Sequence, residues 1–159
     1  MGHDGCKKVR GTKVHVAVDP QSLPLSIRVG PGNEHDSERF VDVMEGVKVK
    51  LGKGRSKTRP GELVGDSAYD AREIRTYLRR RGIKANIPVN PRNRRRPKCG
   101  RPYRLNMETY KRMRGAVERL FSWLTGGFRR LALRWERLTS TFLGFIQLAC
   151  ITIYWRVLR

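Results

Sequence analysis

The stretch that decides the fold runs from Tyr110 to Glu136 and reads YKRMRGAVERLFSWLTGGFRRLALRWE. Apolar side chains recur in it every three or four residues, which predicts a helix with one apolar face. These side chains are Met113, Val117, Leu120, Phe121 and Leu124. Asn106 precedes the pattern as a candidate N-cap, and the pair Gly126-Gly127 should end or break the helix. We expect the other elements of the chain to pack around this helix.

One carboxylate, Glu118, lies beside the apolar stripe on a flank that is otherwise basic. The cations of this flank are Lys111, Arg112, Arg114 and Arg119. The ordinary interpretation is an ion pair between Arg114 and Glu118, which would stabilise the helix by only a few tenths of a kcal/mol. The other interpretation is a functional carboxylate. The helix alone favours the ion pair, because charge pairs are common on helices.

The composition indicates a basic protein of one domain. Its 159 residues are enough for a proper hydrophobic core. The 35 Lys and Arg against 14 Asp and Glu give a formal net charge of +21, which would repel itself without a polyanion nearby. Nucleic acid is therefore the expected partner.

Cysteine usage indicates a reducing compartment. Cys6, Cys99 and Cys150 are scattered and odd in number, so we expect no disulfide framework. His3 and Cys6 have the spacing of metal ligands, but no second pair completes a zinc site, and we interpret them as loop residues. No signal peptide is recognisable at the start. We therefore expect a cytoplasmic protein.

The first third of the chain predicts a loop, a hairpin and a helix. Residues 1–12 carry three glycines and three cations and should form a basic loop. Valines alternate with other residues over 14–18, which predicts a strand, and a short PQS link joins it to a second strand over 23–29. The turn-rich loop GPGNEHDS should end on Asp36 or Ser37 as the cap of a helix over 38–46.

The remainder alternates between short strands, helices and basic loops. Residues 52–62 form a basic, glycine-rich connector, after which Leu63 and Val64 make a short buried strand. A helix follows over 71–81 with Gly82 as its cap, and then a strand over 84–89. The expected division is thus a basic loop at 1–12, strands and helices at 13–89, a basic loop at 90–105 and two helices at 106–159. This order predicts a mixed α/β layer fold.

Asp66 stands where the strand of Leu63 and Val64 ends, and two interpretations apply to it. An Asp in this position commonly caps the following turn. It could equally be a metal ligand at the carboxyl end of a sheet strand, where open α/β folds place their sites. Glu118, on a helix packed across the sheet, could complete such a site. Two carboxylates in a very basic chain suit a hard cation such as Mg²⁺ that bridges to a phosphodiester.

A series of short motifs runs through the chain in a fixed order. GDSAYDA is followed by a helix, RGI, NIPV, then Y-x3-R-x3-ER-x-F-x-WL and FRRLALRWERL; GHDGCKKVRGTKVHVAVDPQSLPL and GPGNEHDS come before them. Together these motifs resemble the DDE transposases of bacterial and archaeal insertion sequences. The resemblance covers essentially the whole chain.

The resemblance implies a ribonuclease-H-like mixed sheet flanked by helices, with a triad of two Asp and one Glu that holds two divalent metals, Mg²⁺ or Mn²⁺. Asp66 matches the second Asp of the triad and Glu118 matches the Glu. Arg114 matches the Arg that the family places four residues before its Glu. The chain departs from the family at Lys111, where a Tyr is usual, and at Thr125, where the family has a Lys.

A larger departure concerns the first Asp of the triad, which in the family ends a strand before the GHDG-like loop. Asp4 matches the loop aspartate and is a poor candidate for that ligand. We therefore expect the fold to lack its first, central strand and the chain to be inactive alone. A decayed remnant, a misassigned start and a frameshift that joins an upstream reading frame all stay open.

The implied reaction is DNA transposition, with strand cleavage and joining at insertion-sequence ends by metal-dependent phosphoryl transfer. Duplex DNA is the expected partner, contacted by the basic loops at 48–59 and 92–101. The candidate DNA-binding residues are Lys7, Lys8, Arg10, Lys13, Arg92, Arg94, Arg95, Arg96, Lys98, Arg114 and Arg119. No base-reading motif is evident, so end specificity, target preference and oligomeric state stay open, a homodimer included.

The last helix, Leu138 to Leu158, has no charge between Thr139 and Trp155. Membrane spans need about 20 apolar residues, and this run is shorter and interrupted by polar residues. We expect it to pack against the sheet and expect no membrane partner. Two rival functions remain: a non-catalytic binder of nucleic acid, and a small membrane-associated protein built on this helix.

Overall fold

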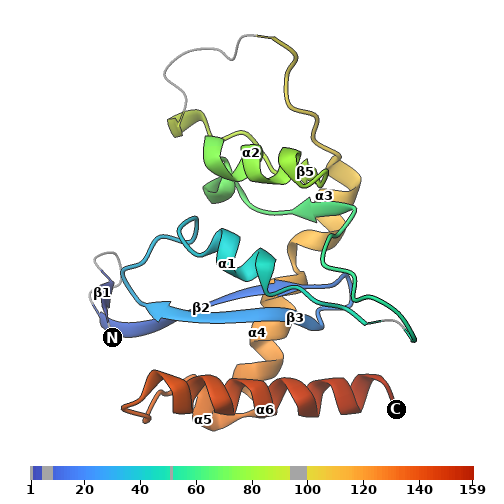
Figure 1. The fold of residues 1–159 in the computed structure, drawn as a ribbon. Coiled ribbons are helices and arrows are strands. Elements are labelled where there is room, and N and C mark those ends of the chain that lie inside the picture. The colour runs from blue at the N-terminus through green and yellow to red at the C-terminus, as the bar shows by residue number, and fades with distance from the viewer. Residues whose placement is uncertain (1, 5–8, 51, 94–99) are drawn as a thin grey trace.

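The computed structural model describes residues 2–4, 9–50, 52–93 and 100–159, which form two small sheets between layers of helices (Figure 1). The antiparallel sheet contains β1 (Gly2–Asp4), β2 (Val9–Val18) and β3 (Pro24–Pro31), in that order. The second sheet is the parallel pair of β4 (Glu62–Val64) and β5 (Lys84–Asn86). The expected mixed α/β class is confirmed.

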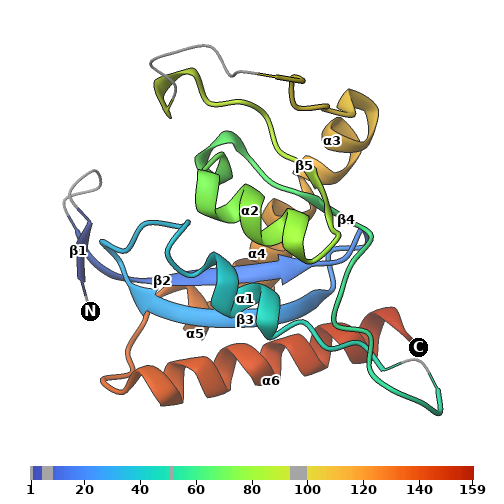
Figure 2. The same cartoon turned by 45° about the horizontal axis from the view of Figure 1, so that its top comes forward.

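The helices cover both faces of the β2–β3 hairpin (Figures 1 and 2). They are α1 (Phe40–Glu45), α2 (Arg72–Arg80), α3 (Met107–Arg114), α4 (Ala116–Gly127), α5 (Arg129–Ala132) and α6 (Thr139–Val157), with the short 3-10 turns η1 (Ser67–Tyr69) and η2 (Pro91–Asn93). α1 contacts one face of the hairpin, while α4 and α6 contact the other. α2 packs against α1 and β5.

The predicted hairpin is confirmed, and its two faces pack against different partners. Val14 pairs with Val29 and Val16 with Ile27, and all four side chains pack against the core formed with α4 and α6. His15 lies between the two valines and therefore points to the opposite face, where it is buried. The alternation of the sequence thus separates an apolar face from a polar one.

The basic loop expected at residues 1–12 is wrong in part. Residues 2–4 form β1, and β2 begins at Val9, with His3 paired to Arg10. Gly11 also accepts a backbone hydrogen bond from Gly32, which extends the hairpin beyond the valines. The pairing uses backbone groups, so it does not need the β-branched side chains that the prediction relied on.

The helix expected over 38–46 is shorter, and its expected cap is wrong. α1 begins at Phe40, its N-cap residue is Arg39, and no side chain caps it. The physical reason lies in Asp36, whose carboxylate pairs with Lys13 on β2. Likewise the strand expected over 84–89 ends at Asn86, because the Ile87 carbonyl accepts a hydrogen bond from Arg75 and not from a strand.

The helix that follows Asn106 is broken once. Asn106 caps α3, since its side chain accepts a hydrogen bond from the Thr109 amide at 3.1 Å, and the predicted cap is confirmed. The helix then breaks at Gly115, which lies between α3 and α4, and ends at Gly127 as predicted. Leu120 and Leu124 of α4 are buried in the core.

The C-terminal helix α6 packs on the sheet, as expected. Its buried side chains are Phe142, Ile146, Ala149, Cys150 and Ile153. Tyr154 adds a hydrogen bond from its hydroxyl to the Pro24 carbonyl at 2.7 Å, which ties α6 to β3. By length and composition alone α6 could also cross a membrane. Core helices of water-soluble proteins pass the same test, and α6 supplies part of this core.

A buried ion pair fixes the segment between β4 and β5. Asp70 is 4% exposed and Arg75 8% exposed, and Arg75 Nε donates to Asp70 Oδ1 at 2.5 Å. Arg75 also donates to the Ile87 carbonyl at 2.9 Å, while Asp70 Oδ2 accepts from the Asn90 amide at 2.8 Å. The Tyr103 ring lies 3.8 Å from the Arg75 guanidinium. One pair therefore joins α2, the end of β5 and the segment before α3.

Replacing Arg75 by Met should lower the free energy of unfolding by about 3–5 kcal/mol, because the charge of Asp70 stays buried without the opposite charge of Arg75. Urea denaturation measures this loss. The matched control is Arg72→Met, on the exposed side of α2, which should change stability by less than about 0.5 kcal/mol. Adding Asp70→Asn to Arg75→Met should recover part of the loss. Equal effects of the two arginine variants would contradict this account.

Candidate active site

Asp66 lies just beyond the carboxyl end of β4 and is exposed. Its Oδ1 accepts a hydrogen bond from the Ala68 amide at 2.9 Å, so Asp66 is the N-cap of η1. The capping interpretation is therefore confirmed. A carboxylate offers about four lone-pair positions, and this cap uses one of them. The remaining positions face solvent at the edge where parallel strands end, so the ligand interpretation stays a prediction.

Glu118 lies in the first turn of α4 and is also exposed. A negative charge there is favoured by the helix dipole. Arg114 is the last residue of α3, on the other side of the break at Gly115. Among the ion pairs of the described residues there is none between Arg114 and Glu118. The ordinary interpretation of Glu118 as half of a helix ion pair thus finds no support in this arrangement.

The side-chain amide of Asn86 fixes the start of α3, which leads into the Glu118 helix, to the sheet that carries Asp66. Asn86 at the end of β5 is buried, and its amide nitrogen donates to the Asn106 carbonyl at 3.1 Å. In return the Asn106 backbone amide donates to Asn86 Oδ1 at 3.0 Å. α3 also contacts β4 directly. The strand that leads to Asp66 and the helix that leads to Glu118 are therefore held against each other.

The site does not contain a complete ligand set for two metals within the described residues. Carboxylates are suitable ligands for Mg²⁺ or Mn²⁺, and Asp66 and Glu118 are both exposed. In the described part of the chain, however, no group of three His, Cys, Asp or Glu residues could hold a metal ion. A two-metal site needs further ligands, so these two carboxylates fit only part of the requirement.

Tyr69 marks the place where two acidic loops approach each other. Burial, together with the charges of Asp36 and Asp66, raises the pKa of its hydroxyl to about 12. Tyr69 therefore stays protonated at neutral pH. The Phe40 ring at the start of α1 lies 5.7 Å from the Tyr69 ring. The loop before α1 thus comes near the Asp66 turn, although Asp36 and Asp66 are 30 residues apart in sequence.

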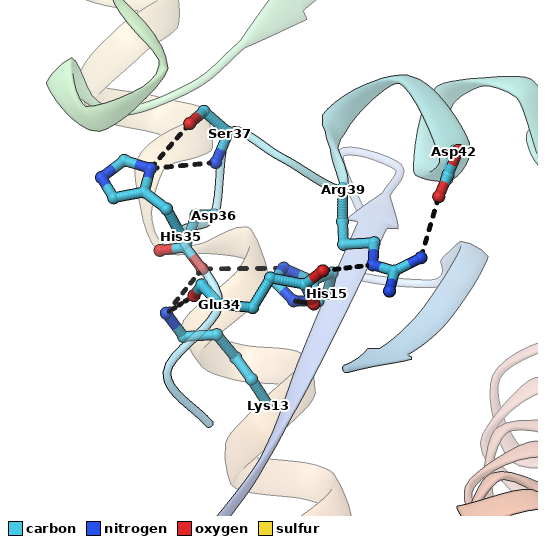
Figure 3. Close-up of polar contacts among 8 residues, drawn as sticks. All are labelled: Lys13, His15, Glu34, His35, Asp36, Ser37, Arg39 and Asp42. Carbon is cyan, nitrogen blue, oxygen red and sulfur yellow. Dashed lines mark hydrogen bonds and ion pairs between the residues drawn. The ribbon is translucent and has the colours of Figure 1, made fainter. Parts of the chain in front are cut away.

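A polar cluster that the sequence did not predict lies beside this point (Figure 3). Arg39 Nε donates to Glu34 Oε1 at 2.6 Å, and Lys13 Nζ lies 3.2 Å from Asp36 Oδ1. His15 has a carboxylate at each ring nitrogen: Glu34 Oε2 is 3.5 Å from Nε2, and Asp36 Oδ1 is 3.6 Å from Nδ1. Neither His15 Nε2 nor Glu34 Oε2 has a hydrogen-bond partner among the described residues.

The one sequence signal for this cluster was a histidine between valines on a strand, combined with the acidic loop NEHDS. The alternation of the strand predicts which face of the sheet His15 lies on, but it does not predict which residues contact His15 there. The loop supplies that partner, and it does so by using Asp36 in the cluster and not as a helix cap.

The predicted DNA-binding residues fall into four groups. Arg92 and Arg114 are exposed. Lys13 and Arg119 make contacts within the protein: Lys13 donates to the Glu34 carbonyl at 2.9 Å, and Arg119 donates to Ser22 Oγ at 3.0 Å and to the Pro20 carbonyl at 3.3 Å. Arg10 lies on β2. The others lie outside the described residues; they are Lys7, Lys8, Arg94, Arg95, Arg96 and Lys98.

A comparison of the sequence with known protein families identifies the family of this chain. Residues 1–154 match the family described as "Transposase DDE domain". The chain therefore belongs to the DDE transposase family, and the resemblance noted from its motifs is confirmed.

Two relatives are similar along most of this chain. A Brucella ovis protein, named as a transposase for insertion sequence element IS6501, is 32% identical over 146 residues, which cover 91% of this chain and 98% of the relative. A Burkholderia cepacia protein, named as a transposase for insertion sequence element IS402, is 30% identical over 150 residues, which cover 94% of this chain and 65% of that longer relative. No solved structure matches the chain at a significant level.

His15 should make the stability of the protein sensitive to acid. Burial lowers its pKa below 6.5, against the opposing charges of Asp36 and Glu34, and Lys13 and Arg39 lower it further. The folded state therefore binds a proton less readily than the unfolded state, so this contribution is present above about pH 6.5 and is lost as pH falls below it. The urea midpoint should fall more between pH 7.5 and 5.5 in the native chain than in His15→Gln.

The control for this measurement is His35→Gln, because His35 is exposed and lies on the loop that supplies Glu34 and Asp36. That variant should keep the pH dependence of the native chain. A His15→Gln variant with an unchanged dependence would show that this imidazole is not the titrating group.

Proposed function

We propose that this chain acts in DNA transposition, by metal-dependent cleavage and joining of strands at the ends of an insertion sequence. The observation that carries the proposal is the position of two exposed carboxylates, Asp66 after β4 and Glu118 in the first turn of α4, in a chain that matches the DDE domain over residues 1–154. The free Cys150 thiol suits the cytoplasm as its place of action.

In this proposal Asp66 and Glu118 hold divalent ions, Mg²⁺ or Mn²⁺. Such ions, when bound, activate the attacking oxygen and stabilise the leaving oxygen of a phosphodiester. Asp66 keeps its cap to Ala68 while an exposed oxygen binds the ion, so the η1 turn fixes the direction of the carboxylate. Glu118 is fixed through α4, whose Leu120 and Leu124 are buried two and six residues later.

The proposed fold is ribonuclease-H-like, and two open strand edges support it. β2 pairs with β3 along Thr12–Val18, but on its other edge it pairs with β1 only over Val9–Gly11. β4 pairs with β5, and no strand of the described residues pairs with its other edge. Both edges lie between α1 and α2 on one side and the α3–α4 segment on the other (Figure 2). A further strand that joins β2 to β4 would make one sheet, and an Asp at its end would complete the ligand set.

This arrangement predicts that the 159-residue chain does not cut or join DNA alone. Addition of an upstream strand that ends in Asp should give Mg²⁺-dependent cleavage of the element's own ends. Asp66→Asn or Glu118→Gln in the extended protein should then lower the cleavage rate by several orders of magnitude, because two-metal catalysis depends on every carboxylate that holds a metal ion. A strand-cleavage assay measures all four proteins.

The control is Glu108→Gln, which removes an exposed carboxylate from the first turn of α3 and should leave cleavage unchanged. Robust cleavage by the short chain would refute the need for another strand. An extended protein that binds DNA without cutting it would support a non-catalytic binder instead.

DNA binding should rest on phosphate contacts and carry little sequence preference. Exposed arginines lie on α2, α3 and the loop before α3; they include Arg72, Arg79, Arg80, Arg104, Arg112 and Arg114. Each phosphate contact contributes roughly −0.9 to the slope of log K against log salt concentration. The double variant Arg112→Ala/Arg114→Ala should therefore make this slope shallower by up to about 1.8, as measured by fluorescence anisotropy.

The matched control removes the same charge from the end of α6 and the residues after it, on the opposite side of the sheet from α3 (Figure 1). Arg156→Ala/Arg159→Ala should leave the slope nearly unchanged. Equal slopes for both double variants would mean that the cations act through net charge and not as a defined surface.

A further inference from the structure

The C-terminal helix has a second apolar face, which points away from the core. Four large side chains on it are exposed: Leu148 by 60%, Ile151 by 62%, Trp155 by 71% and Leu158 by 74%. They lie opposite the buried residues of α6, and Figures 1 and 2 show this helix as the outermost layer of the molecule on that side of the sheet. Contiguous exposed apolar surface of this kind marks an interaction site.

The spacing of this face is that of a helix–helix seam. With Thr141 and Gly144 included, the positions are 141, 144, 148, 151, 155 and 158, which alternate between intervals of three and four. This alternation is the a/d pattern by which two helices pack along each other. Gln147, which is exposed beside the seam, gives it a polar rim.

We propose that α6 is a self-association surface, through which two copies of the chain pack their α6 helices antiparallel about a two-fold axis. The proposal does not depend on the catalytic roles of Asp66 and Glu118. It names the second copy as the occupant, because the seam is complementary to itself in this orientation. Two-fold symmetry requires such a surface to present both a projection and the hollow that receives it.

The register follows from the sequence of the seam. When the axis passes between Leu148 and Ile151, Leu148 of each copy meets Ile151 of the other. In the same register Trp155 meets Gly144, and Leu158 meets Thr141. The large Trp155 side chain of one copy thus lies over Gly144 of the other, which has no side chain. A β-carbon added at Gly144 would have no atom within 4 Å, so the space that the indole needs is open.

The charges near the surface also favour this orientation, and its size determines how strong the dimer should be. Arg156 and Arg159 are the cations closest to the seam's C-terminal end, and antiparallel packing places those of the two copies at opposite ends. This matters in a chain of net charge +21. The seam from 141 to 158 is roughly 26 Å long at 1.5 Å per residue. It covers less than the roughly 800 Å² per partner of a standard interface, so the dimer should be weak and concentration-dependent.

Sedimentation equilibrium of the whole chain at high salt tests the proposal, because salt screens the repulsion between copies. We expect a monomer–dimer equilibrium that Ile151→Glu weakens at least about tenfold, as is usual for a central interface residue. The control Val89→Glu places the same charge at an exposed valine after β5 and should leave the equilibrium unchanged. A chain that stays monomeric at the highest soluble concentration would overturn the proposal.

The register has its own test. Gly144→Leu should weaken the dimer by filling the hollow that receives Trp155, and Trp155→Ala should weaken it by removing the projection. The double variant Gly144→Leu/Trp155→Ala should associate more tightly than either single variant, because a leucine then meets an alanine. Circular dichroism confirms that each variant is folded. Additive losses in the double variant would overturn the register.

Lipid is the competing occupant, and the same variants distinguish it. Flotation with phosphatidylcholine vesicles should leave the chain unbound. Binding to the vesicles that is tightened by Gly144→Leu would overturn the proposal, because added apolar surface favours lipid and opposes the helix seam.

Discussion

The buried pair of Asp70 and Arg75 is the interaction on which the arrangement of α2, β5 and the segment before α3 depends. Their charges are removed from water, so each requires the other and the backbone groups that complete the hydrogen bonding. Those backbone groups belong to Ile87 and Asn90, which lie past the end of β5. The segment leading to α3 can therefore leave the sheet only in one direction, and the Asn86–Asn106 bonds then fix where the helix begins.

This pair also gives different roles to the two aspartates of GDSAYD. Asp70 is buried and committed to Arg75, whereas Asp66 is exposed and bonded only through one oxygen to the following turn. A carboxylate that binds a metal must be reachable and must keep free lone pairs. Burial thus separates the structural aspartate from the candidate ligand, which the spacing of the motif cannot do.

Local patterns predicted the elements well, and contacts between distant residues account for what they missed. The hairpin followed from alternating valines, and the α3 cap followed from Asn106, because both depend on neighbours in sequence. The strand β1 and the late start of α1 depend on partners elsewhere, such as the pairing of Asp36 with Lys13. For the site, Asp66 and Glu118 could be named from motifs. Their support through Asn86 and the approach of the Asp36 loop to Tyr69 required the fold.

The hairpin also has a consequence for how the protein is made. Val14, Val16, Ile27 and Val29 find their apolar cover in α4 and α6, and Arg119 of α4 closes the hairpin turn from 97 residues away. At a synthesis rate of roughly 5–20 residues per second, the cover leaves the ribosome on the order of ten seconds after the hairpin. During that interval the apolar face is exposed to whatever else is present. α4 and α6 therefore cover the hairpin only late in biosynthesis, and chains cut short before α4 should depend on chaperones for solubility.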